Sequence, residues 1–241
     1  MPKIETILSP ALFHLYEEEL GQKNVVVIDI LRATTTICVA FANGAREVLP
    51  VAKPEDASAM QQLGWIAAAE RHGETVEGFD LGNSPQDYTR ERVSGQKIAI
   101  TTTNGTRALQ MSSAAKHVWV GSFLNLNTLC DYLSRDNSDI LLFCAGWKDK
   151  FNLEDTVFAG AVASLLADTF SISDDATLAA MDLYKKAAQD LPGYLQKASH
   201  VNRFKSLHIE TDLDVCLKTN TLSVLPEFKN GTIQNRHHAR A

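Results

Sequence analysis

The chain of 241 residues lacks long apolar runs, closely spaced cysteines and an excess of basic residues. No apolar run approaches the ~20 residues of a membrane-spanning helix, so we expect no membrane association. The net charge of −6 and the lack of a basic stripe argue against a nucleic-acid partner. No two of the four cysteines have C-x-x-C spacing, which favours buried, reduced thiols. With an N-terminus that shows no signal-peptide pattern, these absences predict a cytoplasmic protein.

The motifs of several enzyme classes are also missing. The sequence has no G-x-S-x-G elbow, no H-E-x-x-H helix and no G-x-G-x-x-G after an apolar strand. The polar turn at Thr101–Arg107 lacks the lysine of a nucleotide-binding P-loop. A serine or zinc hydrolase and a dinucleotide-binding enzyme are therefore disfavoured.

Short apolar segments alternate with amphipathic ones through the first two-thirds of the chain. Several of the apolar segments are hydrophobic nearly throughout, which indicates strands buried on both faces of a parallel or mixed sheet. The expected strands are Lys3–Leu8, Val25–Ile30, Glu47–Val51, Trp65–Ala69, Lys97–Thr102, His117–Gly121 and Ile140–Ala145. The expected helices are Ala11–Leu20, Thr34–Asn43, Pro54–Leu63, Pro85–Arg92, Thr106–Ser112 and Asn125–Ser134. This alternation predicts a three-layer α/β/α fold with a mostly parallel or mixed sheet.

The last third is rich in helix. We expect helices over Glu154–Thr169, Asp174–Gln189 and Leu191–Leu207, a turn at Thr211–Asp214 and a short strand at Leu222–Val224. Asn230–Ala241 is expected to be frayed. We therefore predict one domain over residues 1–228 and a tail over 229–241, with two α/β lobes, the second from about residue 100, as the alternative. The apolar helices could pack on the sheet or form a homodimer face.

Chemistry is concentrated first at the end of the strand expected at Val25–Ile30. It ends in Asp29, followed by Arg32 and by Thr34 and Thr35 at the start of a helix. Open α/β sheets bind ligands at the carboxyl ends of their strands, near helix N-termini. The segment suits a divalent metal and an anion, although Asp29 could simply cap the helix and pair with Arg32.

Two further polar turns follow strands. Arg71 could bind a phosphate or carboxylate, and Asn83 and Ser84 lie at an expected helix N-terminus, where free N–H groups accept anions. His72, between them, is more simply a solvated loop residue. In the second turn, Asn104, Gly105 and Thr106 can form an anion-binding nest or an ordinary strand-to-helix turn.

Adjacent acids, Glu154 and Asp155, begin the first long helix of the last third. They could complement the helix dipole, or one could bind Mg²⁺, which prefers carboxylate oxygens and retained waters. His200 could be a general acid or base, or a structural hydrogen-bonding residue. Asp212 and Asp214 are interpreted as turn residues in preference to ligands.

Five of these segments, in this order, resemble the 2-phosphosulfolactate phosphatase family, the ComB family. They are Asp29–Thr35, Glu70–Glu74 with Gly78–Pro85, Thr102–Thr106, Cys144–Gly146 with Glu154-Asp155, and Ser199-His200. The resemblance spans about residues 3 to 226. It implies a ComB-like α/β/α fold and a Mg²⁺-dependent phosphatase that converts 2-phospho-3-sulfolactate to 3-sulfolactate and phosphate, a step toward coenzyme M.

Physical reasoning then suggests roles. The substrate, a small phospho-acid, carries about four negative charges, if its phosphate ionises like that of phosphoserine. We expect Mg²⁺ on Asp29 and on Glu154 or Asp155, and the substrate's anionic groups on Arg32 and Arg71, with the three turns donating hydrogen bonds.

The attacking group is either an activated water or Asp29 itself. Haloacid-dehalogenase-type phosphatases place a second Asp two residues after the first, where this chain has Leu31, so a ligand role for Asp29 is favoured. The alternatives to this function are another 2-phosphohydroxy acid as substrate, a non-catalytic anion-binding protein, and a structural subunit.

Overall fold

The protein is described here by a computed structural model that covers residues 1–71, 74–172, 174–207 and 209–236. The strands are β1 (Lys3–Ile7), β2 (Asn24–Ile28), β3 (Glu47–Pro50), β4 (Ile66–Arg71), β5 (Glu74–Thr75), β6 (Lys97–Thr101), β7 (His117–Gly121), β8 (Ile140–Cys144), β9 (Ser171–Ile172), β10 (Pro226–Lys229) and β11 (Thr232–Asn235). The α-helices are α1 (Ala33–Ala42), α2 (Pro54–Gln61), α3 (Arg90–Val93), α4 (Gly105–Met111), α5 (Leu126–Leu133), α6 (Leu153–Leu166), α7 (Asp175–Ala187), α8 (Leu191–Leu195), α9 (Ser199–Ser206) and α10 (Leu213–Cys216). The 3₁₀ helices are η1 (Pro10–Leu15), η2 (Glu17–Gln22), η3 (Pro85–Asp87), η4 (Ser112–Ala114), η5 (Phe123–Asn125) and η6 (Glu210–Asp212).

The described strands form one mixed sheet of 11 strands in the order β5-β4-β6-β3-β11-β10-β7-β2-β8-β1-β9. Helices cover it, which confirms the predicted α/β/α architecture. β3, β6 and β4 form one parallel group, and β7, β2, β8, β1 and β9 form another. The antiparallel hairpin β10–β11 joins the two groups. Both groups draw strands from before residue 100.

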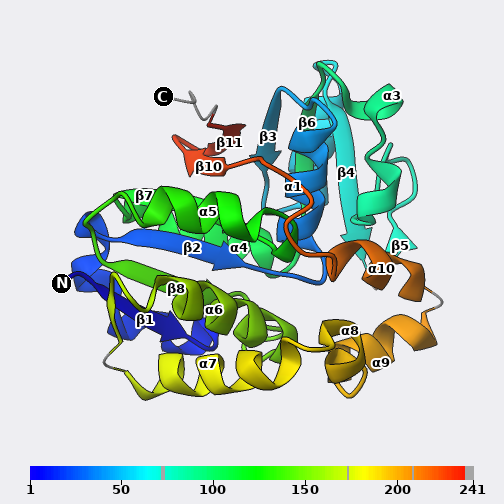
Figure 1. Cartoon of the computed structure of the whole chain (residues 1–241). Coiled ribbons are helices and arrows are strands. Elements are labelled where there is room, and N and C mark those ends of the chain that lie inside the picture. The colour runs from blue at the N-terminus through cyan, green and yellow to red at the C-terminus, as the bar shows by residue number, and fades with distance from the viewer. Residues whose placement is uncertain (72–73, 173, 208, 237–241) are drawn as a thin grey trace.

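The two parallel groups run in different directions across the molecule. Figure 1 shows β2, β8 and β1 lying across the lower half, whereas β3, β6 and β4 run across that direction at the upper right. The carboxyl ends of β2 and of β4 both point toward the region of α8, α9 and α10. The twist of the sheet therefore brings strand ends from both groups toward one place.

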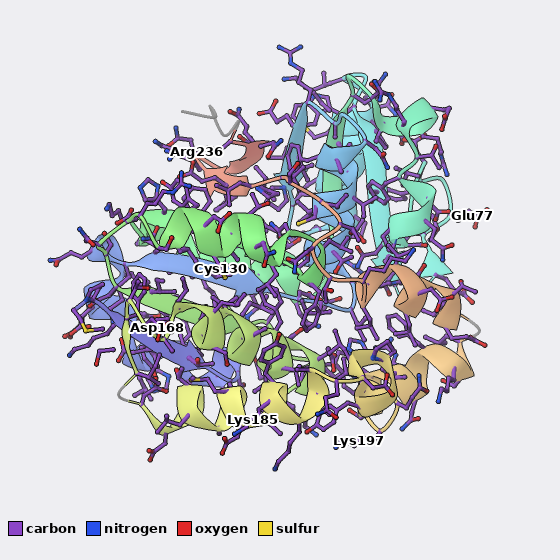
Figure 2. The ribbon with its side chains drawn as sticks, viewed as in Figure 1. Glu77, Cys130, Asp168, Lys185, Lys197 and Arg236 are labelled. Carbon is purple, nitrogen blue, oxygen red and sulfur yellow. The ribbon has the colours of Figure 1, made fainter. Side chains whose placement is uncertain are left out.

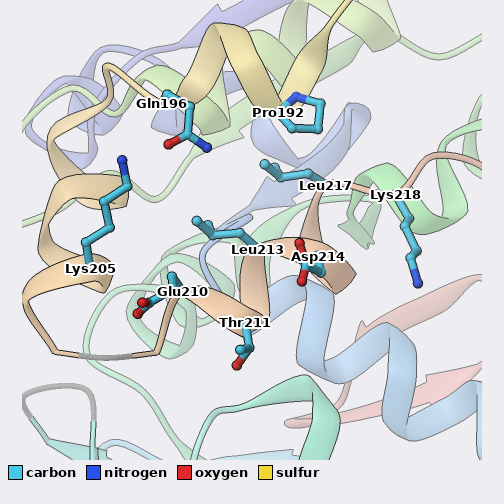
Figure 3. A pocket seen from close by; sticks show the side chains of 9 residues that line it. All are labelled: Pro192, Gln196, Lys205, Glu210, Thr211, Leu213, Asp214, Leu217 and Lys218. Carbon is cyan, nitrogen blue, oxygen red and sulfur yellow. The ribbon is translucent and has the colours of Figure 1, made fainter.

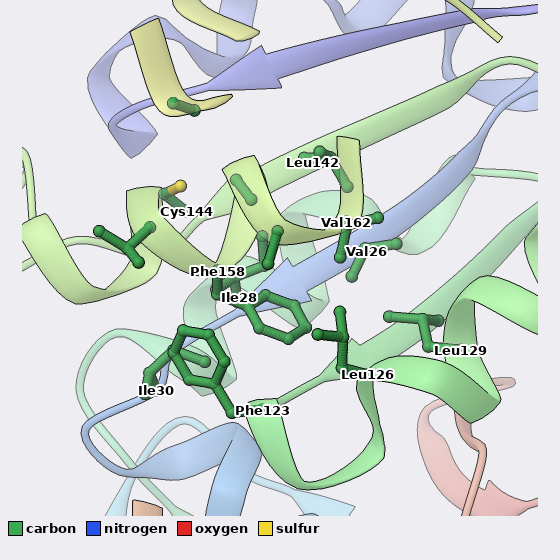
Figure 4. Close-up of a cluster of buried hydrophobic side chains, with 14 of the residues drawn as sticks. Val26, Ile28, Ile30, Phe123, Leu126, Leu129, Leu142, Cys144, Phe158 and Val162 are labelled. Carbon is green, nitrogen blue, oxygen red and sulfur yellow. The ribbon is translucent and has the colours of Figure 1, made fainter. Parts of the chain in front are cut away.

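The apolar run of β2 is explained by burial on both faces. Val26 and Ile28 pack with α5 and α6, as Figure 4 shows, and they belong to one hydrophobic cluster. Val25 and Val27 point to the opposite face and pack with α1 and α4 in a second cluster. Because successive strand residues face opposite sides, a strand between two helical layers is apolar along most of its length.

Three expected helices are interrupted. The segment Ala11–Leu20 forms η1 and η2 because few of its residues are buried, too few for an apolar helical stripe. Pro85–Arg92 breaks at Tyr88, whose carbonyl accepts a hydrogen bond of 2.7 Å from Asn43 Nδ2. Leu191–Leu207 breaks before Ser199, because Ala198 is extended and buried. The break gives α9 its own orientation.

The end of the chain differs most from the expectation. Thr232–Asn235 is not frayed, because it forms β11 in the interior of the sheet, paired with β10 and β3. The strand expected at Leu222–Val224 is an extended segment whose Leu222 N–H and Val224 carbonyl bond to Leu124 and Asn125. The strand begins later, at Pro226.

The remaining expectations concern the surface and the cysteines. The four thiols, those of Cys38, Cys130, Cys144 and Cys216, are free and buried, as predicted. Figure 2 shows Cys130 inside the fold, whereas Lys185 and Lys197 extend outward. Within the described ranges, none of the helices has the length and apolar character needed to cross a membrane. His72 and Gly73 lie outside the described residues.

Candidate active site

A cleft of about 460 Å³ lies at the carboxyl ends of β2, β4, β6 and β8, beside α9. It gathers six of the residues singled out from the sequence: Asp29, Arg32, Arg71, Asn83, Asn104 and His200. Its other lining residues are Leu31, Glu70, Thr102, Thr103, Trp147, Lys148 and Arg203. Segments up to 174 positions apart therefore meet at one place, which we take as the candidate active site.

Asp29 lies immediately after β2 and is buried. Its carboxylate accepts a hydrogen bond from the Ala33 N–H at the start of α1. The Thr34 hydroxyl donates to the Asp29 carbonyl at 2.9 Å, and the Thr35 hydroxyl donates to the Ile30 carbonyl at the same distance. These buried threonines thus hold the turn that presents Asp29.

Burial raises the pKa of Asp29 to about 6. The nearby charges of Glu154 and Glu70 also raise it, whereas His200 and the Ala33 N–H oppose the shift. A buried carboxylate with a raised pKa in a cleft is typical of a functional site, because keeping it ionised there costs free energy.

Glu154 and Asp155 lie in the first turn of α6, and their carboxylates have different hydrogen-bond partners. Glu154 Oε1 lies 2.8 Å from His200 Nδ1, and its side chain is buried. Asp155 accepts from the Ile30 N–H at 2.9 Å and the Gly146 N–H at 3.1 Å, so it ties the ends of β2 and β8 together. Burial, Glu154 and Asp29 together hold the pKa of Asp155 well above its usual range.

A metal ion would need oxygen ligands here. Among the residues that the structure describes, no three His, Cys, Asp or Glu side chains are grouped to hold one. The cleft nevertheless offers the Asp29 carboxylate and Asn83 Oδ1, a buried oxygen without a hydrogen-bond partner in the described part of the chain. Mg²⁺ keeps several waters and needs only one or two carboxylates plus substrate phosphate. The donor chemistry fits that ion.

Arg32 is held by a residue whose side-chain role the sequence did not indicate. Its Nη1 lies 2.5 Å from Asp212 Oδ2, and both side chains are buried. Asp212 Oδ1 also accepts from the Ser84 hydroxyl at 2.6 Å and from Gln86 Nε2 at 3.0 Å. The turn expected at Thr211–Asp214 is instead the end of η6 and the start of α10, and the Asp212 carboxylate connects α1, η3 and η6.

The turn at Asn104–Thr106 packs directly against Asp29. An added Cβ at Gly105 would lie 2.6 Å from the Ala33 Cβ and 3.0 Å from Asp29 Oδ2, so only glycine fits there. The Thr106 N–H donates to Thr102 Oγ1 at 3.1 Å, and the Thr102 N–H donates to Thr106 Oγ1 at 3.2 Å. Of the three, Asn104 lines the cleft.

Lys148, Arg203 and Trp147 also line the cleft, and nothing in the sequence pattern assigned them a role there. Lys148 lies in a left-handed turn after β8, and Arg203 lies on α9. Lys148 Nζ is 4.8 Å and Arg203 Cζ is 5.0 Å from the Trp147 ring centroid. The Trp147 ring also stacks on His200 at 6.3 Å. No spacing rule links these residues, since the loop and α9 meet only in the fold.

Two other cavities lie nearby. One of about 430 Å³ shares Arg32 and Asn83 with the cleft. Another of about 410 Å³ lies among α8, α9, η6 and α10, where Figure 3 shows Lys205 and Glu210 on one side and Lys218 on the other. The second shares no residue with the cleft. Because neither of these cavities includes Asp29, Arg71 or His200, we place the site in the cleft around Asp29.

Comparison with known proteins shows the family of the chain. The family model described as 2-phosphosulpholactate phosphatase matches residues 11–231. A protein of Caldanaerobacter subterraneus subsp. tengcongensis, named probable 2-phosphosulfolactate phosphatase, is 38% identical over 223 residues, which cover 90% of this chain and 92% of that protein. A protein of Picosynechococcus with the same name is 40% identical over 221 residues, which cover 88% of this chain and 91% of that protein. The chain belongs to the 2-phosphosulfolactate phosphatase family.

Proposed function

We propose that the protein is a phosphatase that hydrolyses 2-phospho-3-sulfolactate to 3-sulfolactate and phosphate with the help of Mg²⁺, a step toward coenzyme M. The observation that carries this proposal is the cleft in which Asp29, Arg71 and His200 converge. The names of the related proteins support the substrate. Their names do not mention a metal, so Mg²⁺ rests on the oxygen donors of the cleft.

The charge of the cleft suits such a substrate. A phosphate, a carboxylate and a sulfonate together carry about four negative charges near neutral pH. Arg71, Lys148 and Arg203 line the cleft together with Arg32, which Asp212 already partly neutralises. The acids Asp29 and Glu70 would repel an anion unless a cation lay between them and it, which favours a metal at Asp29.

The metal would be held by Asp29 and Glu154. Glu154 is preferred to Asp155 because both Asp155 oxygens accept backbone hydrogen bonds. When bound, Mg²⁺ would offset the charge of the phosphate and act as a Lewis acid toward the attacking water. Asn83 Oδ1 would provide a further oxygen at the same cleft.

The protein's own groups would do the rest. Arg71 would orient the phosphate, because its planar guanidinium can bind two phosphate oxygens at once. An ionised Glu154 can only accept a hydrogen bond, so it fixes the His200 proton on Nδ1 and leaves Nε2 to exchange a proton with the substrate. His200, in its doubly protonated form, would donate a proton to the oxygen that leaves phosphorus.

The test is phosphate release from 2-phosphosulfolactate, 2-phospholactate and phosphoglycolate, each with Mg²⁺ and with EDTA. We expect turnover that depends on Mg²⁺ and is fastest with 2-phosphosulfolactate. Faster turnover of another phospho-acid would retain the mechanism and replace the substrate. Absence of turnover from well-folded protein, with phosphate binding that persists in EDTA, would favour an anion-binding protein instead.

The Asp29→Asn variant should lose about 10³-fold in kcat, on the scale of a lost transition-state contact. Acid quenching of the wild-type reaction with labelled substrate distinguishes the two possible attackers. Phosphate recovered covalently on Asp29 would rule out direct attack by water and make Asp29 the nucleophile.

A further inference from the structure

We propose that Lys148 and Arg203, arranged around Trp147, form a second anion subsite in the cleft, which takes a sulfonate or carboxylate group separate from the phosphate. The proposal deepens the proposed function and rests on it for the identity of the ligand. It starts from two cations that the sequence pattern did not single out and that line the same cleft as Asp29 and Arg71.

The two cations share one ring. The Lys148 ammonium and the Arg203 guanidinium lie 4.8 Å and 5.0 Å from the centroid of Trp147. Cations are attracted to the face of an indole, so the ring can hold both side chains in place. Two like charges on one ring repel each other, however, and an anion between or beside them removes that cost.

These cations differ from the others in the cleft by their partners. Arg32 is bound to Asp212 at 2.5 Å, and Arg71 donates to the Glu70 carbonyl at 2.7 Å. Within the described residues, neither Lys148 nor Arg203 lies within 4.0 Å of a carboxylate oxygen. An aromatic ring in place of a carboxylate positions a cation without neutralising it, so its charge remains for a ligand.

The position of the pair fits the second acid group of a three-carbon substrate. Trp147 stacks on His200, whose Nδ1 is bound to Glu154. In the proposed reaction, His200 faces the ester oxygen that joins phosphorus to the substrate carbon skeleton. A sulfonate or carboxylate on that skeleton would then lie on the His200 side of the cleft, next to Lys148 and Arg203, while the phosphate lies toward Arg71.

Binding of the product tests the subsite without any turnover. Titration of 3-sulfolactate into the wild-type protein, followed by calorimetry and by tryptophan fluorescence, should show saturable binding. Lys148→Met and Arg203→Met should each weaken it about 10- to 100-fold, as expected for the loss of a hydrogen bond to a charged group. In the same variants, the affinity for inorganic phosphate should fall much less than the affinity for 3-sulfolactate.

Lys197→Met is the matched control, because Lys197 Nζ lies 3.7 Å from the Tyr194 ring centroid outside the cleft. It removes the same charge from the same kind of contact and should leave 3-sulfolactate binding unchanged. Trp147→Phe identifies the fluorescence signal, since its loss in that variant locates the responding ring. Equal binding of 3-sulfolactate by wild type and by the Lys148→Met/Arg203→Met double variant would overturn the subsite.

Kinetics separate failure of the subsite from failure of the proposed function. In the variants, KM should rise more for 2-phosphosulfolactate than for 4-nitrophenyl phosphate, which has no second acid group. If the wild type binds 3-sulfolactate through Lys148 and Arg203 but does not hydrolyse 2-phosphosulfolactate, the subsite stands and the proposed reaction fails. If 2-phosphosulfolactate is hydrolysed and the ratio of the two KM values does not change, the subsite is wrong.

Discussion

At the scale of single residues, the side chains at the cleft fall into two groups: those that carry charge and those that hold the charged groups in place. Asp29 carries the charge, whereas the Thr34 hydroxyl holds its turn and Gly105 leaves room for its carboxylate. Arg32 carries the charge, whereas Asp212 fixes its position. Substitutions in the two groups should have different effects, because loss of a supporting side chain changes the stability of the fold as well as the activity.

The raised pKa of Asp29 predicts a pH-dependent effect of Mg²⁺ on stability. The pKa is 3.8 in the unfolded chain and about 6 in the fold, so protonation of Asp29 stabilises the fold fully below about pH 4. That contribution is lost as the pH rises through about 6, where the buried carboxylate becomes charged. Because Mg²⁺ binds the charged form, the rise in Tm on adding Mg²⁺ should be larger at about pH 7.5 than at about pH 5.

Thermal unfolding with and without Mg²⁺ measures this difference. Asp29→Asn is the control, since asparagine does not titrate, and its response to Mg²⁺ should be small at both pH values. A wild-type response that is the same at both pH values would contradict a metal at Asp29.

Replacing Asp212 tests the support of Arg32. Asp212→Asn removes the negative charge that Asp212 places beside the buried Arg32 guanidinium, and broken buried ion pairs cost about 3–5 kcal/mol. We expect a loss of that order in the free energy of unfolding, measured by urea denaturation, together with a higher KM. Asp214→Asn, at an exposed neighbouring position, should change neither. Wild-type stability of Asp212→Asn would show that another group compensates Arg32.

Much of the cleft could be predicted from the sequence because it is built at strand ends. Asp29, Arg71 and Asn104 follow strands or end them, and that position alone marks them as candidates. Asp212 could not be assigned its partner, because 180 positions separate it from Arg32. Lys148 and Arg203 carry no motif, and only packing brings their loop and helix to one ring.

At the scale of secondary-structure elements, the strands were predictable where both of their faces are buried. The runs Val25–Ile28 in β2 and Ile140–Cys144 in β8 are apolar, and their short length favours a strand over a helix. β11 was missed because Thr232–Asn235 contains one apolar residue, Ile233, and its neighbours are polar. The segment forms a strand because it pairs with β10 and β3. Strand formation commonly depends on such neighbours more than on the segment's own residues.

The hairpin β10–β11 should therefore be essential to the sheet. Ile233 is fully buried and packs in the cluster that includes Val48 and Ile98. Ile233→Ala should lower the free energy of unfolding by about 2–5 kcal/mol, the usual cost of such a deletion in a core. Lys229→Ala, at an exposed position of β10, is the control in the same denaturation experiment. Equal stability of the two variants would mean that this end of the chain is dispensable.

At the scale of the whole molecule, two parallel groups of strands share one sheet and one cleft. β4 and β6 deliver Arg71 and Asn104 to the cleft from one group, and β2 delivers Asp29 from the other. A ligand that contacts both groups stabilises both, because it binds only when they are folded together. The hairpin β10–β11 provides the hydrogen-bonded link between them.

Hydrogen exchange can show whether the two groups unfold as one unit. With the sheet continuous through β10 and β11, we expect peptides that contain β6 and β8 to exchange with the same free energy of opening under mild denaturant. Mg²⁺ and phosphate together should raise protection in both peptides equally, since the cleft joins their ends. Independent lobes would give two free energies, and a ligand held by one group would protect only that group's peptide. The single value expected here would place residues of both groups in one domain and make the cleft an interface that forms only on complete folding.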